Sequence, residues 1–167
     1  RGILGCGRRP AATSLSESLP PSDRPCTIVV CPDVQDPENL GASLRIAAGF
    51  GVDGVVLGPR SADPFSRRVQ RVSMGNVYRL PPLHTPDVPA TLAELRTAHG
   101  IESWATVLDA DAAGLSSLKR PQRLALVFGS EGHGLQHDVV QVCDRRVTIP
   151  MRAGVDWLEA GTPLIIA

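Results

Sequence analysis

The sequence predicts one α/β domain in which a mostly parallel β-sheet is flanked by helices. Short apolar runs alternate along the chain with segments whose apolar residues recur at helical spacing. The apolar runs are continuous rather than alternating, which is typical of parallel strands buried on both faces. The chain has 167 residues, of which 43% are hydrophobic, and this suffices for one core. No apolar run approaches the ~18 residues of a membrane span, so we expect no membrane contact.

Residues 1–25 are rich in Gly, Pro, Ser and Arg, and we interpret them as a linker or tail before a domain at 26–167. The β-branched run Thr27–Cys31 predicts the first strand of that domain. The later apolar runs predict strands at 52–57, 77–80, 103–108, 124–128 and 146–149. The run at 124–128 is the most apolar of them and is expected at the centre of the sheet.

Helical spacing of apolar residues predicts helices at 39–50, 88–99 and 136–143. The first of these would be capped by Asp36 or Glu38. A closing helix is expected from Val155 onward. Its Pro163 would cost about 3 kcal/mol in a helix interior, so we expect an interrupted helix there.

Net charge identifies no partner, because the chain has 17 Lys+Arg and 17 Asp+Glu. Lys119 is the only lysine, however, and all the other basic residues are arginines. Arginine makes bidentate hydrogen bonds with phosphate, although GC-rich coding would also produce this bias. The four cysteines form no CxxC pair and are expected to be reduced thiols, with Cys31 and Cys143 in the core. Together with the lack of a signal peptide, they predict a cytoplasmic protein.

Two motif-like patterns are set aside. The glycines of 49–54 match GxGxxG, but they follow a predicted helix and precede a strand, the reverse of a dinucleotide site. They are better explained as a helix stop and a turn. His133 and His137 have a helical metal spacing, but no third ligand is evident, so we predict no metal site.

The first informative loop runs from Asp36 to Arg45, after the first strand. Ligands of parallel α/β sheets bind beyond the carboxyl ends of the strands, which places Asn39 at such an end. Arg45 lies about 240° further around the helix, between apolar residues, and this favours an anionic partner. The alternative is that Asn39 is only a helix cap and Arg45 only a surface ion pair.

Two more loops follow strand ends. The segment 128–135 places three glycines and Glu131 after the most apolar strand, where a permissive backbone allows close approach to a ligand. The segment Ile149–Met151 ends the last predicted strand in Ile-Pro-Met. With Leu158 it would form an apolar wall suited to an adenine-like base.

Taken together and in order, these three segments resemble the motifs of the SpoU (TrmH-like) RNA ribose 2′-O-methyltransferases, of the SPOUT superfamily. The motifs are Asn39-x-Gly-x-x-x-Arg45, Phe128-Gly-Ser-Glu-Gly-x-Gly-Leu135 and Ile149-Pro-Met151, and the likeness covers roughly residues 26–158. The resemblance implies a C-terminal trefoil knot and a homodimer with its site near the subunit interface. It also implies S-adenosylmethionine as cofactor and a ribose 2′-hydroxyl in rRNA or tRNA as substrate.

The resemblance also implies residue roles. Asn39, Arg45 and Glu131 would form the catalytic group. Gly129, Ile149, Met151 and Leu158 would contact the cofactor. We expect Arg45 to bind a neighbouring phosphate and to stabilise negative charge on the ribose oxygen, because an arginine pKa above ~12 makes it a poor base.

Arginines between the second and third predicted strands form the best local basic patch, opposed mainly by Asp63. Arg67, Arg68 and Arg71, with Arg45, are therefore expected to hold RNA, helped by Arg60 and Arg79. The alternative is a solvated or dimer-facing charged segment.

The chain departs from the family pattern at Trp157 and Glu159, where a small polar residue and Asn are usual. This leaves open a catalytically silent RNA-binding relative. Another α/β nucleotide enzyme is disfavoured, because the sequence has no phosphate loop. Residues 1–25 are too few for an RNA-binding domain, but they are consistent with the remnant of a link to one.

Overall fold

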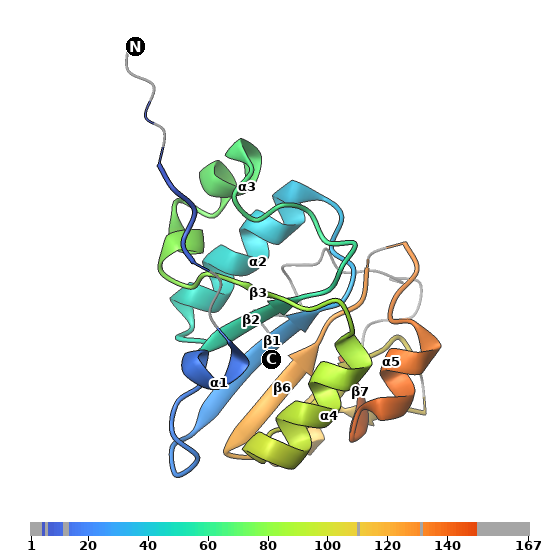
Figure 1. The fold of residues 1–167 in the computed structure, drawn as a ribbon. Helices are drawn as coiled ribbons and strands as arrows, with labels where there is room; N and C mark the ends of the chain where they lie inside the picture. Colours follow the sequence, from blue (N-terminus) through green and yellow to red (C-terminus); the bar gives the residue numbers. More distant parts are fainter. Residues whose placement is uncertain (1–4, 6, 12–13, 110, 131, 150–167) are drawn as a thin grey trace.

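The computed structural model describes residue 5 and residues 7–11, 14–109, 111–130 and 132–149. In this part of the chain, seven strands form one sheet in the order β3-β2-β1-β6-β4-β7-β5 (Figure 1). The strands are β1 (Cys26–Cys31), β2 (Gly54–Leu57), β3 (Leu83–His84), β4 (Glu102–Thr106), β5 (Ala113–Gly114), β6 (Arg123–Val127) and β7 (Arg145–Thr148). Every pairing between them is parallel, as predicted.

The helices are α1 (Leu15–Ser18), α2 (Pro37–Gly49), α3 (Arg67–Val72), α4 (Val88–His99) and α5 (His137–Val142), with 3₁₀ turns η1 (Asn76–Tyr78) and η2 (Leu115–Ser117). Alternate residues of β1 enter two separate cores. Val29 packs with the residues that α2 and α3 bury, whereas Val30 packs with those of α4 and α5. The sheet is therefore buried on both faces, which explains the continuous apolar runs.

The strand predicted at 77–80 is wrong. The chain forms the 3₁₀ turn η1 there, after Met74 (φ +52°) and Gly75 (φ +78°) turn it sharply. Val77 is fully buried, so the short apolar run reflects one anchoring side chain rather than a strand. The edge strands β3 and β5 were not predicted, because two-residue strands are too short to show a pattern.

The segment before β1 is attached to the domain. Its helix α1 has a capping box between Ser14 and Glu17, and Leu15 and Leu19 pack against the core. The buried Arg123 donates hydrogen bonds to the carbonyls of Pro21 (2.8 Å) and Arg24 (2.7 Å), among others. Residues 14–25 are thus anchored, while the division into tail and domain stays a prediction.

Burial explains the chemistry of the described cysteines, which are free thiols. Desolvation raises the pKa of Cys31 to about 12 and that of Cys143 to about 11. Cys143 donates to the carbonyl of Val139 (Sγ to O, 3.2 Å). These thiols stay protonated at neutral pH and pack as small apolar groups.

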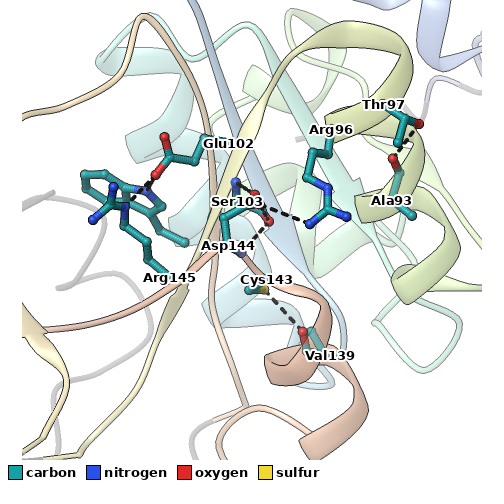
Figure 2. A network of polar contacts seen from close by, with 10 residues as sticks. Ala93, Arg96, Thr97, Glu102, Ser103, Val139, Cys143, Asp144 and Arg145 are labelled. Carbon is teal, nitrogen blue, oxygen red and sulfur yellow. Dashed lines mark hydrogen bonds and ion pairs between the residues drawn. The ribbon is translucent and has the colours of Figure 1, made fainter.

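Asp144 ties α4, β4 and the turn before β7 together (Figure 2). Its carboxylate accepts hydrogen bonds from the Ser103 amide (2.8 Å) and hydroxyl (2.9 Å) and lies 3.3 Å from the Arg96 guanidinium. Burial alone would raise the pKa of Asp144. The hydrogen bonds from Ser103 and the charge of Arg96 outweigh it and hold the pKa below its usual value.

This arrangement predicts a pH-dependent loss of stability on Asp144→Asn. Because the pKa is lower in the folded state, the carboxylate stabilises the fold fully above its unfolded pKa of about 3.9. That contribution is lost as the pH falls through the folded pKa. We expect urea unfolding to give a free energy lower by about 1–2 kcal/mol at pH 7, and a difference that shrinks below about pH 4.

The exposed Asp23→Asn serves as the matched control and should stay within about 0.5 kcal/mol of the unmodified chain at every pH. If Asp144→Asn lowered the free energy of unfolding by the same amount at every pH, that result would contradict the role given to this carboxylate.

Candidate active site

A pocket of about 250 Å³ opens where two loops meet beyond the sheet. One loop follows β1 and leads into α2, and the other follows β6. The two strands are neighbours in parallel register, so their carboxyl ends lie at the same edge. The described residues that line the pocket are Asp33, Val34, Gln35, Asp36, Asn39, Gly129, Ser130, Gly132 and His133. Two of the three predicted motif segments therefore contribute to one cavity.

The first loop brings Asn39 to the pocket wall in the first turn of α2. The N-cap of that helix is Asp36, whose carboxylate accepts from the Glu38 amide at 2.7 Å, and Pro37 follows it. Of the two predicted caps, Asp36 is confirmed and Glu38 is wrong. The reading of Asn39 as the helix cap is also wrong, because Asn39 is already inside the helix.

Arg45 lies elsewhere. It is exposed on α2, nearly two turns beyond Asn39, and does not line the pocket. The ion pairs of the described residues do not include it, so the alternative of a surface ion pair is not supported there. The structure therefore separates two residues that the sequence motif places together.

The second loop closes on itself directly after β6. Ser130 and Gly134 exchange backbone hydrogen bonds of 3.1 and 2.8 Å, and Gly134 has φ +65°. A Cβ placed on Gly129 would lie 2.3 Å from the carbonyl carbon of Gly134, so only glycine fits at 129. This closure turns Ser130, Gly132 and His133 toward the pocket.

The remaining predicted site residues are not assembled here. Ile149 directly follows β7, is partly buried, and is not among the residues that line the pocket. Glu131, Met151 and Leu158 lie outside the described residues, as do Trp157 and Glu159. The knot and the cofactor contacts therefore stay predictions.

The predicted basic patch is partly neutralised. Arg60 pairs with Asp33 (2.6 Å) and Arg68 pairs with Glu38, both near the pocket. The expectation that Asp63 mainly opposes the patch is wrong, because Asp63 pairs with Arg9 at 2.6 Å. These partners come from the β1–α2 loop, from α2 and from the N-terminal segment, so local sequence could not reveal them.

Arg67, Arg71 and Arg79 are exposed and take part in no ion pair within the part of the chain that the structure describes. Sequence reasoning also missed the pocket residues Asp33 and Gln35, which lie outside the motifs. Ser130 lies within the 128–135 motif, but no role was predicted for it.

Among the described residues, no group of three or more His, Cys, Asp or Glu side chains is placed to hold a metal ion. None of the described helices has both the length and the apolar character of a membrane span.

Comparison with known proteins gives a consistent result. Residues 26–162 match the SpoU rRNA Methylase family. An uncharacterized tRNA/rRNA methyltransferase of Mycobacterium bovis is 36% identical over 170 residues, which are 100% of this chain and 58% of that protein. The chain thus spans little more than half the length of this curated relative.

Solved structures agree. An AdoMet-bound rRNA methyltransferase from Sinorhizobium meliloti superposes with a TM-score of 0.82 at 25% identity, covering 93% of this chain and 58% of that one. An RNA 2′-O ribose methyltransferase superposes with a TM-score of 0.77 at 27% identity, covering 92% and 57%.

The loop geometry predicts that two glycines of one loop differ in their tolerance of alanine. Gly129→Ala would force a Cβ against the Gly134 carbonyl, and we expect a lower thermal unfolding midpoint because the loop must open. Gly132→Ala is the matched control, because a Cβ there meets no atom within 4 Å and the backbone is not left-handed. Equal midpoints for the two variants, measured by circular dichroism, would contradict the closed loop.

Proposed function

Because the chain belongs to the SpoU rRNA methylase family, we propose that it transfers a methyl group from S-adenosylmethionine to a ribose 2′-hydroxyl of rRNA or tRNA. The observation that carries the proposal is the convergence of Asn39 and the 129–133 loop on one pocket. The cofactor of this family is S-adenosylmethionine, and a structural neighbour contains it. The 2′-oxygen specificity follows the neighbour described as an RNA 2′-O ribose methyltransferase.

The pocket walls fit a sulfonium cofactor and a neutral sugar. Gly129 and Gly132 leave the backbone unobstructed, and the carboxylates of Asp33 and Asp36 lie in the wall. No arginine or lysine is among the described lining residues. The Asp33 carboxylate is paired with Arg60 and the Asp36 carboxylate caps α2, so the described lining offers polar groups to a ribose but no unpaired arginine or lysine to a phosphate.

The reaction forms a bond between the ribose oxygen and the methyl carbon and breaks the bond from that carbon to sulfur, whose electron pair stays on sulfur. The bound cofactor supplies a methyl group already activated by the positive sulfonium. The protein has to hold oxygen, carbon and sulfur in line while the hydroxyl proton passes to solvent water. The Asn39 amide, which can both donate and accept, is proposed to orient the ribose.

Arg45 is proposed to bind the phosphate beside the target ribose. Its place on the exposed face of α2, outside the pocket, suits a flanking anion. Glu131 keeps the catalytic role that the family resemblance implies for it.

The proposal also includes a homodimer, with the site near the subunit interface, and a cytoplasmic location. A monomer in sedimentation equilibrium would contradict the dimer.

We expect Arg45→Ala to abolish methyl transfer while leaving cofactor affinity within about threefold, because the guanidinium would act on RNA. Transfer is measured with radiolabelled S-adenosylmethionine on total tRNA and rRNA. Cofactor affinity is measured by calorimetry, with S-adenosylhomocysteine and ATP as comparisons. The exposed Arg24→Ala is the control and should behave like the unmodified chain in both assays. Loss of cofactor binding in Arg45→Ala would contradict this role.

The site of methylation has its own chemical test. A methyl group on the 2′-oxygen removes the internal nucleophile of alkaline RNA cleavage, so the product should yield an alkali-resistant dinucleotide that carries the label. Label recovered instead in a methylated base would overturn the 2′-oxygen assignment and retain the methyltransferase. RNA binding with no transfer and no cofactor binding would identify the catalytically silent relative.

A further inference from the structure

The helix α3 and the turn η1 carry exposed aromatic and basic side chains. In Figure 1, α3 lies beyond α2, away from the sheet. We call the surface that they form the Tyr78 surface, and it comprises Phe65, Arg67, Arg71, Met74, Tyr78 and Arg79. Tyr78 is 54% exposed and Met74 is 76% exposed. Large apolar groups exposed among charges mark interaction sites more often than chance.

The Tyr78 ring is held in place. Its centroid lies 6.0 Å from that of Phe65, with the rings inclined by 41°. The Arg9 guanidinium lies over Phe65, 5.6 Å from the ring centroid, and is paired with Asp63. The Tyr78 ring contacts Phe65, which in turn contacts Arg9. A ligand that stacks on Tyr78 would therefore lose little free energy in ordering the Tyr78 side chain.

The backbone beside it is strained. Met74 has φ +52°, a region that non-glycine residues enter at a cost, and Gly75 continues the turn at φ +78°. The Met74 side chain recovers little of that cost by burial, because it is largely exposed. The exposed Met74 side chain is therefore available for a contact outside the fold.

The surrounding charges favour a polyanion. Arg67 and Arg71 lie four residues apart on one helix, and Arg79 follows Tyr78 directly. None of these three arginines forms an ion pair among the described residues, whereas the neighbouring Arg60 and Arg68 have carboxylate partners. A second copy of this chain that docked on this surface by a twofold axis would place arginines against arginines.

The Tyr78 surface is anchored to the pocket-lining helix. Arg68 of α3 pairs with Glu38, the residue before Asn39. Further along, α2 and α3 touch at Gly41, where an added Cβ would lie 2.7 Å from the Val72 Cβ. The helices therefore keep a fixed spacing, which holds the Tyr78 surface in a fixed place relative to the helix that lines the pocket.

We propose that a base of single-stranded RNA next to the target nucleotide stacks on Tyr78 against Met74, with its phosphates held by Arg67, Arg71 and Arg79. Stacking combined with arginine–phosphate contacts is how proteins bind single strands without reading sequence. The inference rests on the proposed function, because it assigns the substrate of that same site as unpaired RNA.

The chain offers a direct probe, because Tyr78 is its only tyrosine. The 167-residue chain produced with 3-fluorotyrosine has one ¹⁹F resonance, from this ring. We expect that resonance to shift on titration with a 12-nucleotide oligo(A) RNA, and less with the same length of duplex RNA. The midpoint should equal the Kd from fluorescence anisotropy of labelled oligo(A). Saturable binding with an unchanged resonance would overturn the proposal.

Variants give a second readout. Tyr78→Ala should weaken oligo(A) binding by about tenfold, within the range for loss of one stacked base, and Tyr78→Phe should restore it. Phe50→Ala removes an equally exposed aromatic ring, 67% exposed at the end of α2, and should change nothing. Arg71→Ala should lower the slope of log Kd against log salt by about one. Equal losses in Tyr78→Ala and Phe50→Ala would contradict a specific platform.

Met74→Gly tests the contact of Met74 with RNA separately from the stability of the fold. This variant should have a higher thermal unfolding midpoint, because the backbone strain is relieved, and should bind oligo(A) more weakly. A variant that is stabilised and binds RNA normally would exclude Met74 from the contact.

The proposed function and this inference can fail separately. RNA binding that depends on Tyr78, without any methyl transfer, would retain the inference and overturn the activity. Methyl transfer whose KM for RNA is unchanged in Tyr78→Ala would retain the activity and overturn the inference. A dimer that dissociates in Tyr78→Ala, measured by sedimentation, would assign the surface to a second copy and overturn it as well.

Discussion

The parallel pairing of β1 with β6 is the constraint on which the site depends. Residues 26–30 of β1 pair with residues 123–127 of β6, so both strands end at the same height. If β1 and β6 were antiparallel, the loops that follow them would lie at opposite edges of the sheet and could not line one pocket. The register is secured by burial on both faces, because every β1 residue except Thr27 packs into one of two cores. Asn39 and Gly129 meet as a consequence of this pairing.

Close approach of backbone segments shapes what surrounds that edge. Gly129 lets the loop after β6 fold back on Gly134, and Gly41 lets α3 settle against α2. The first contact forms the pocket wall, and the second holds α3, with part of the proposed RNA-binding surface, against α2. Both contacts would be lost with any larger side chain, so the geometry of the proposed site depends on two missing Cβ atoms.

Charge shows why composition alone is a weak guide to partners. The chain has no net charge, yet its carboxylates form ion pairs with particular arginines and not with others. Arg60 pairs with Asp33, which lines the pocket, and Arg68 pairs with Glu38, the residue before Asn39. Arg67 and Arg71, in the same short segment, stay exposed to solvent. Neighbouring residues of one type therefore have different tasks.

The sequence by itself determined the parallel α/β class, most of the strands and the motifs of the family, because burial on both faces and strand-end glycines leave local patterns. It placed Asn39 and Gly129 at strand ends, and these do meet. It could not show that 77–80 is a turn, because one buried valine looks like a strand. Nor could it show which arginines are neutralised. That outcome depends on carboxylate partners about 30 residues away in the sequence, and only tertiary packing decides it.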